Sequence, residues 1–244
     1  MDKIKVSICV TSYNRSEQTI RSFKDVLHHS MVDEVVIVDD CSDLGHYNTL
    51  KYMVDRINVE LSSTKVYLFR NEKNLDCYRN KRRAIELARN EWVIILDSDN
   101  IIDTEYLNFL RFYLHGGISR NTIIQPSFAK PSFDFRKYAG FWISTLNVWQ
   151  YIDDPSFEVM LNAMNYCVNR DQYLQVFDES VDPVTSDSIY QNYNWFKSGG
   201  MMYVAKGVEY EHPISQDSHY KHNHKRTPPG FHEDIVQRIR DFKK

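Results

Sequence analysis

Two carboxylates stand one residue apart directly behind an apolar run, at Asp97-Ser98-Asp99. The run at 92–96 (WVIIL) has the composition of a strand that is buried on both faces. In open α/β sheets ligands bind at the carboxyl ends of the strands, so this pair would face a binding edge. Carboxylate oxygens suit hard divalent cations, which in turn hold phosphate oxygens. The triplet predicts a site for a metal ion and a diphosphate, and the plainer alternative is a solvated turn.

The bulk properties are those of an ordinary soluble globular chain: 244 residues, 42% of them hydrophobic and 26% charged. A net charge of -3 gives no overall field that would attract nucleic acid or an anionic membrane. No apolar stretch is long enough to span a bilayer, and the first residues lead into a strand rather than a signal peptide. Cys9, Cys41, Cys77 and Cys167 are scattered, which is typical of reduced thiols. We therefore expect a cytoplasmic protein without a nucleic-acid partner.

Apolar runs alternate with helical periods through the first half of the chain. Runs at 6–10, 34–38, 65–69 and 92–96 predict strands, and the spacing of apolar residues between them predicts helices. Such alternation is typical of βαβ units in a mainly parallel sheet. Three of these strands end in polar loops, which begin at Thr11, Asp39 and Asp97. Because parallel strands share one carboxyl edge, we expect these loops to converge there.

The second half of the chain is less regular. Residues 127–155 are rich in aromatic side chains and fit no simple period, whereas 188–197 predict a helix and 201–204 a strand. Residues 234–239 predict a short amphipathic helix. Because no repeat, low-complexity segment or linker divides the chain, we predict a single α/β domain over 1–244.

Several short motifs, taken in order, resemble glycosyltransferase family 2. They lie at 6–15 (VSICVTSYNR), 38–42 (VDDCS), 74–80 (NLDCYRN) and 96–100 (LDSDN), and the similarity continues at 165–170, 177–179, 186–187 and 210–212. The resemblance implies a GT-A fold with a nucleotide-sugar-binding half at 1–117 and an acceptor and catalytic half at 118–212. A flexible loop and a helix would follow at 213–244. The motif of processive polysaccharide synthases (QxxRW) is absent, which implies transfer of one sugar at a time.

Three positions depart from the family pattern. The glycine that is common after the acidic pair of the second strand is Cys41, and the glycine expected after the Arg79-Asn80 pair is replaced by Arg82. The last acidic position of the metal motif is Asn100.

The resemblance implies an inverting, metal-dependent transfer from a nucleotide diphosphate sugar, with uridine favoured, to a hydroxyl of a glycan or glycoconjugate. The implied donor-binding residues are Thr11, Tyr13, Arg15, Asp39, Asp40, Arg79, Asp97 and Ser98. Of the acidic pair, the resemblance favours Asp40 as acceptor of the uracil N–H. Mn2+ or Mg2+ would be held by Asp99, Asp97 and His212. Asp187 matches the catalytic base, and Asp182 is the second candidate.

Other interpretations stay open for individual residues. Asp39 could belong to a turn, Arg79 to a helix surface, and Asp187 could be a charge at a helix N-terminus. The segment 212–232 holds five histidines and fits either a zinc site or a basic loop that closes over the diphosphate from about 216 to 229. Trp142, Trp149 and Trp195 could stack on an acceptor sugar or belong to the core.

Two other classes of protein also stay open. A nucleotide-sugar-binding or glycan-binding module whose catalysis has decayed would agree with Arg82 and Asn100. A sugar nucleotidyltransferase is less favoured, since such an enzyme carries a glycine-rich loop after the first strand and residues 11–16 contain no glycine.

Overall fold

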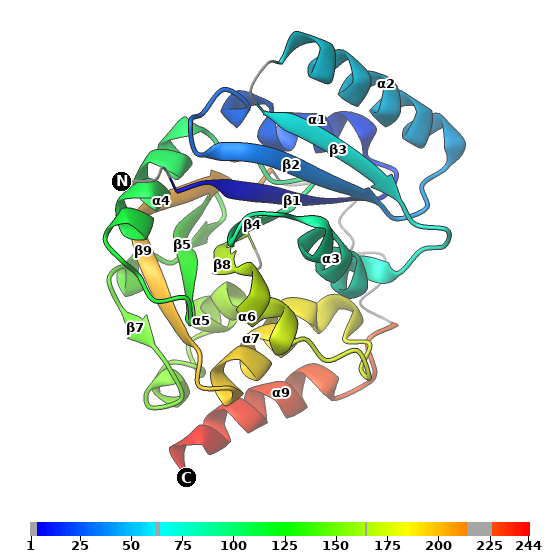
Figure 1. Ribbon diagram of the computed structural model, residues 1–244. Helices are drawn as coiled ribbons and strands as arrows, with labels where there is room; N and C mark the ends of the chain where they lie inside the picture. The colour runs from blue at the N-terminus through cyan, green and yellow to red at the C-terminus, as the bar shows by residue number, and fades with distance from the viewer. Residues whose placement is uncertain (1–3, 62–63, 164, 214–225) are drawn as a thin grey trace.

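A nine-stranded sheet forms the centre of the computed structural model, which describes residues 4–61, 64–163, 165–213 and 226–244 (Figure 1). The strands are β1 (Val6–Ser12), β2 (Val32–Asp39), β3 (Lys65–Arg70), β4 (Trp92–Asp97), β5 (Thr122–Lys130), β6 (Phe133–Asp134), β7 (Trp142–Ile143), β8 (Cys167–Asn169) and β9 (Met201–Glu211). Their order is β3-β2-β1-β4-β8-β5-β9-β7, and β6 pairs with β5 beside this path.

The longer strand pairings are parallel, as the alternating pattern predicts. β3, β2, β1 and β4 pair in parallel in that order, and β5 pairs in parallel with β9. The short strand β8 lies antiparallel between β4 and β5 and joins the two halves of the sheet. Its three residues are too few to establish a period in the sequence, which is why it is not among the predicted strands. The predicted class, an open and mainly parallel sheet flanked by helices, is confirmed.

Helices cover both faces of the first four strands (Figure 1). They are α1 (Ser16–Phe23), α2 (Leu44–Glu60) and α3 (Asp76–Leu87), followed along the chain by α4 (Thr104–His115), α5 (Pro155–Leu161), α6 (Arg170–Gln175), α7 (Asp187–Lys197) and α9 (Phe231–Arg240). α1 and α2 lie on one side of the sheet in this view and α3 on the other. α4 packs on β9, and α9 packs on α7.

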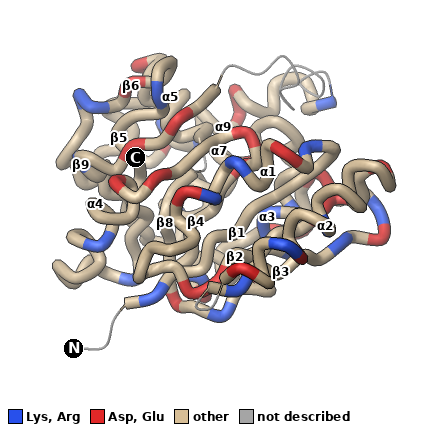
Figure 2. Tube along the Cα trace, turned by 90° about the horizontal axis from the view of Figure 1, so that it is seen from above, with Lys and Arg blue, Asp and Glu red and all other residues tan. Residues whose placement is uncertain are grey.

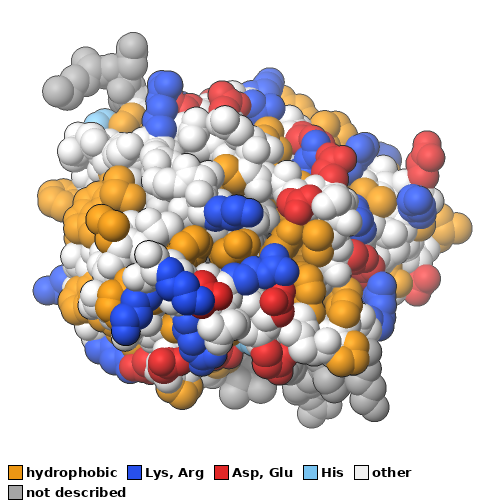
Figure 3. All heavy atoms as spheres, turned by 90° about the horizontal axis from the view of Figure 1, so that it is seen from below, with side chains coloured by type: hydrophobic (Ala, Val, Ile, Leu, Met, Phe, Trp, Pro, Cys, Tyr) orange, Lys and Arg blue, Asp and Glu red, His pale blue; other side chains and the backbone are white. Residues whose placement is uncertain are grey.

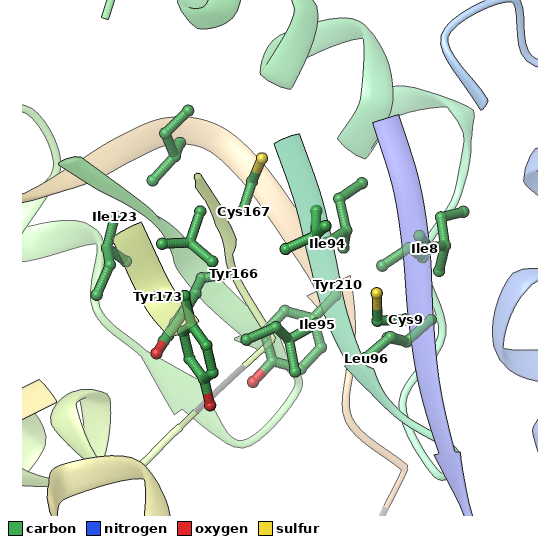
Figure 4. Packing of buried hydrophobic residues seen from close by; sticks show 14 of the residues in the cluster. Ile8, Cys9, Ile94, Ile95, Leu96, Ile123, Tyr166, Cys167, Tyr173 and Tyr210 are labelled. Carbon is green, nitrogen blue, oxygen red and sulfur yellow. The ribbon is translucent and has the colours of Figure 1, made fainter. Parts of the chain in front are cut away.

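The strand that carries the Asp97-Ser98-Asp99 triplet lies in the middle of the core. Residues 93–96 of β4 are completely buried, between β1 on one side and β8 on the other. Figure 4 shows Ile94, Ile95 and Leu96 packed among side chains of the neighbouring strands. Complete burial of each such side chain contributes about 1.5–3 kcal/mol. Asp97 therefore projects from a rigid support.

Charged side chains of both signs are mixed along the Cα trace and over the face seen from below (Figures 2 and 3). This distribution agrees with the small net charge. All four cysteines are free, as their spacing predicts. Across the described ranges, no helix combines the length and the apolar composition that crossing a membrane requires.

Candidate active site

A cavity of about 1450 Å³ opens at the carboxyl ends of β1, β2 and β4. Most of the predicted site residues line it: Thr11, Tyr13, Arg15, Asp40, Asp97, Ser98, Asp99, Asp187 and His212. The pairing of β1 with β4 sets Thr11 beside Asp97 in register, so two of the predicted donor residues meet because of sheet geometry alone. The convergence of strand ends that the sequence predicts is therefore present in the structure.

The two aspartates at the end of β2 have different surroundings. Asp39 is buried outside the cavity lining; its Oδ2 accepts a hydrogen bond from the backbone N–H of Ser42 at 3.1 Å and lies 3.5 Å from Arg70 Nε. Asp40 lines the cavity, and its Oδ1 accepts hydrogen bonds from Asn71 Nδ2 at 2.7 Å and the Leu75 N–H at 2.8 Å. Burial raises the pKa of Asp40 to about 6, although the hydrogen bonds oppose this. The turn interpretation therefore fits Asp39, and the cavity position belongs to Asp40.

Strained backbone gathers around the cavity. The described non-glycine residues in the left-handed region are Asn14 (φ 52°), Cys41 (φ 62°), Asp76 (φ 61°) and Val184 (φ 49°). Asn14 and Asp76 line the cavity, while the other two directly adjoin lining residues. Such residues cost about 1–3 kcal/mol each and gather at functional sites. The conformation of Cys41 also explains the glycine that is common at this position in the family.

A buried lysine lies between the two predicted functional carboxylates. Lys81 Nζ is 2.9 Å from Asp187 Oδ2 and 3.2 Å from Asp97 Oδ1, and the lysine side chain is only 4% exposed. Burial acts to lower the pKa of Lys81, but the two negative charges outweigh it and raise this pKa well above its usual value. Burial also raises the pKa of Asp97, while the charge of Lys81 opposes that rise. Lys81 is thus the ammonium partner of a compact, largely buried ionic group.

Asp187 is the first residue of α7, as the sequence predicts. It follows the short 3-10 helix η4 (Val184–Ser186), and its side chain is 8% exposed. Its Oδ1 accepts a hydrogen bond from Ser188 Oγ at 3.3 Å, while Oδ2 faces Lys81. The carboxylate therefore lies at a helix N-terminus, where the helix dipole favours negative charge.

The three predicted metal ligands line the same cavity, and each already has a partner. Asp99 Oδ2 lies 2.7 Å from Arg15 Nη1, and Asp97 contacts Lys81. His212 Nδ1 lies 2.7 Å from Asn100 Oδ1. In the part of the chain that the structure describes, no three histidine, cysteine or acidic side chains are grouped as metal ligands. The metal site stays a prediction.

The contact with Asn100 nevertheless prepares His212 for a cation. An amide oxygen accepts hydrogen bonds, so Nδ1 is the donor in this contact and Nε2 is the ring nitrogen that remains for another ligand. This is the way in which metal-ligating histidines are usually oriented. Two carboxylates and an oriented imidazole are an acceptable ligand set for Mn2+ or Mg2+ once Arg15 moves away from Asp99.

Residues from distant parts of the chain complete the cavity near Asp187. His232 in α9 lies 3.2 Å from Ser186 Oγ through Nδ1 and 2.9 Å from Glu158 Oε1 through Nε2. Thr227 Oγ1 lies 2.7 Å from Thr185 Oγ1. Nothing in the sequence pattern links Glu158 with His232, which are 74 positions apart. The position of Lys81 could have been found from the helical period, because it shares the inward face of α3 with Tyr78, Ala84 and Ile85.

Other predicted residues are not brought to the cavity. Arg79 contacts Asp182 at 3.4 Å and donates to the backbone carbonyl of Glu179, and neither Arg79 nor Asp182 lines the cavity. Arg79 is two positions from Lys81 on α3, which turns it to another side of the helix. Arg82, which replaces a family glycine, pairs with Glu86 and Glu179.

Neither the tryptophans nor most of the histidine-rich segment is among the described residues that line the cavity. Trp195 is core, with its Nε1 donating to the Met201 carbonyl, and neither Trp142 nor Trp149 lines the cavity. Of the five histidines, His219, His222 and His224 lie outside the described residues. The predicted closing loop at 216–229 is described only from Arg226 onward.

Comparison with known proteins agrees with the motifs. The family model of glycosyl transferase family 2 matches residues 7–117. The resemblance to glycosyltransferase family 2 that the motifs indicate is therefore confirmed for this segment. An uncharacterised glycosyltransferase of Mycoplasma genitalium is 29% identical over 113 residues, which are 45% of this chain and 37% of that protein. A cholesterol galactosyltransferase of Borreliella burgdorferi is 24% identical over 109 residues, or 44% of this chain and 28% of that protein. The matches thus span 37% of the first relative and 28% of the second.

Solved structures show the same fold over nearly the whole chain. S. aureus TarS, residues 1–349, matches with a TM-score of 0.66 at 15% identity, covering 97% of this chain and 64% of that one. The same TarS fragment in complex with UDP-GlcNAc matches with a TM-score of 0.67 at 15% identity, covering 89% and 61%. The predicted GT-A fold is therefore confirmed.

Proposed function

We propose that this chain is a metal-dependent, inverting glycosyltransferase that moves a sugar from a UDP-sugar to a hydroxyl of a glycan or glycoconjugate. One observation carries the proposal: Asp97 on the donor side and Asp187 on the acceptor side line one cavity, and Lys81 lies within hydrogen-bonding distance of both. A site that only bound a nucleotide sugar would not need a second buried carboxylate at this place.

The uridine and phosphate groups would be recognised at the ends of β1 and β2. Asp40, which lines the cavity, would accept the uracil N–H, and the exposed ring of Tyr13 would stack on the base. Arg15 can transfer from Asp99 to a phosphate oxygen, because a guanidinium binds both groups in the same manner. The complex of TarS with UDP-GlcNAc supports a UDP-sugar as donor.

Asp187 would act as general base. It would accept the proton of the acceptor hydroxyl as that oxygen attacks the anomeric carbon and the bond between the sugar and the diphosphate breaks. Attack from the face opposite the leaving group inverts the anomeric configuration. The polar groups of Ser186, Glu158 and His232 lie beside the base and can hydrogen-bond a sugar acceptor.

Asp99, Asp97 and His212 would hold Mn2+ or Mg2+. A bound divalent cation supplies positive charge to the leaving diphosphate. The contribution of this chain is to supply the two strand-end carboxylates and to orient His212 through Asn100.

A binding module without catalysis is the second candidate. Asn100 and Arg82 are the two departures from the family pattern that would agree with such a module. Asn100 has a role in an active site, because its side chain contacts His212, and Arg82 pairs with Glu86 at the surface. The retention of Asp187 with its buried lysine partner favours an enzyme.

Release of UDP from a panel of UDP-sugars tests the proposal. We expect release from at least one UDP-sugar with Mn2+ and a loss of at least tenfold when a chelator replaces the metal. Tight UDP binding without any turnover, over a broad panel of sugars and acceptors, would favour the binding module.

A further inference from the structure

We propose that Lys81 is a positioning residue for the catalytic base, which it holds as an oriented anion and ties to the donor carboxylate Asp97. This inference rests on the proposed function, and it adds a residue that the motifs do not indicate.

The contact joins three separate elements of the fold. Lys81 comes from α3, Asp97 from the end of β4, and Asp187 from the start of α7. The side chains of Lys81 and Asp187 are 4% and 8% exposed, and the ammonium lies within 3.2 Å of both carboxylates. The lysine therefore links the half of the site assigned to the donor with the half assigned to the acceptor.

The burial of this lysine is costly and needs a reason. Its neighbours on the inward face of α3, Tyr78, Ala84 and Ile85, are all buried and largely apolar. An ammonium group at such a position is strongly disfavoured unless it is paired. Well-packed apolar residues often serve stability as well as a buried ion pair does, or better. Stability alone therefore does not account for an ionic group here, whereas a requirement for an anionic base does.

The contact with Lys81 also determines which oxygen of Asp187 remains available to the acceptor hydroxyl. The ammonium holds Asp187 Oδ2, whereas Oδ1 accepts a long hydrogen bond of 3.3 Å from Ser188 Oγ. We therefore assign Oδ1 as the atom that takes the proton from the acceptor hydroxyl. Without Lys81, Oδ2 would lose the contact that fixes it, and the Asp187 side chain would be free to turn away from Asp97.

The test measures UDP release from UDP-GlcNAc and UDP-galactose in Mn2+, with water as acceptor. The variants are K81M, D187N, the double variant K81M/D187N and the conservative variant K81R. R83M is the matched control, because Arg83 is an exposed cation on the same helix. K81M should lower turnover at least 100-fold while the dissociation constant of UDP changes less than about fivefold. K81R should recover part of the loss, and R83M should behave as wild type.

The double variant distinguishes positioning from an independent role. If Lys81 acts through Asp187, K81M/D187N will turn over within about threefold of D187N alone. A further loss of tenfold or more would overturn the proposal, as would K81M turnover within about threefold of wild type. Because the double variant removes one charge of each sign, this comparison with D187N also holds where K81M alone does not fold.

Thermal unfolding without substrate separates this inference from the proposed function. K81M should lower Tm by several degrees in the wild-type background and by less than half as much in D187N. Additive Tm changes would overturn the positioning role even in an active enzyme. Coupled Tm changes in a protein that neither binds UDP nor turns over UDP-sugars would refute the proposed function while preserving the Lys81–Asp187 linkage.

Discussion

Arg15 Nη1 lies 2.7 Å from Asp99 Oδ2, so a cation of the protein itself holds the carboxylate that the resemblance assigns to a metal ion. Both side chains are partly exposed, at 16% and 22%, and line the cavity. A divalent cation must therefore compete with the guanidinium for Asp99, and incoming phosphate groups offer the guanidinium a new partner.

Replacing Arg15 should affect metal and nucleotide in opposite directions. We expect R15Q to bind Mn2+ about fivefold more tightly without nucleotide, since a partly exposed ion pair contributes about 1 kcal/mol. UDP binding in Mn2+ should become weaker, because a phosphate contact is lost. Isothermal titration with each ligand measures both changes, with the exposed Arg21 replaced in R21Q as control. Weaker Mn2+ binding in R15Q would show that Arg15 does not compete for Asp99.

Asn100 should matter through His212. N100A removes the oxygen that fixes the His212 tautomer, so Mn2+-dependent UDP binding should weaken about 10- to 100-fold. N100D keeps an acceptor at this position and should bind as well as wild type or better. H212A should lose as much as N100A, and combining the two should add little. Unchanged binding in N100A would mean that His212 takes no part in holding the cation.

Asp40 should make stability depend on pH. Burial raises its pKa from 3.8 to about 6, so the folded protein takes up this proton at a higher pH than the unfolded chain does. The charged side chain therefore destabilises the fold fully above about pH 6, and the penalty shrinks as the pH falls toward 3.8. We expect D40N to have a higher Tm than wild type at pH 7.5, with a difference less than half as large at pH 4.5. D43N, at an exposed neighbour, is the control. A difference that stays constant or grows toward low pH would contradict the shift.

Cys41 should tolerate glycine better than alanine. Its φ of 62° costs a residue with a Cβ about 1–2 kcal/mol, whereas glycine loses about 0.5–1 kcal/mol in chain entropy. C41G should therefore be more stable than C41A by about 0.5–1 kcal/mol in denaturant unfolding. Equal or lower stability of C41G would show that this backbone is not strained in solution.

The sequence predicts the donor side of the cavity well because sheet geometry determines it. Thr11, Asp40 and Asp97 each lie at or directly beside the carboxyl end of a parallel strand, and such ends meet at one edge of the sheet. The role of Asp187 was predicted from the resemblance to the family. The periodicity of the sequence independently predicts a helix that begins beside it. These residues depend on local patterns that a single sequence contains.

The contacts between distant segments could not be predicted in this way. Lys81 stands among Arg79, Arg82 and Arg83, and only the phase of the helix distinguishes the inward cation from the outward ones. Because of the same helical phase, Arg79 points away from the cavity and contacts Asp182. The pairing of Glu158 with His232 depends on how α9 packs near α5 and α7, for which no short motif exists.

The central claim is that Asp187 removes a proton from the acceptor within a site that binds a UDP-sugar. The most direct test is D187N, in which a carboxamide keeps the size of the side chain and loses its basicity. Donor affinity and turnover should be measured together in Mn2+. We predict UDP binding within about threefold of wild type and a turnover at least 100-fold lower, in line with the usual contribution of a general base. Turnover within about tenfold of wild type would contradict the account.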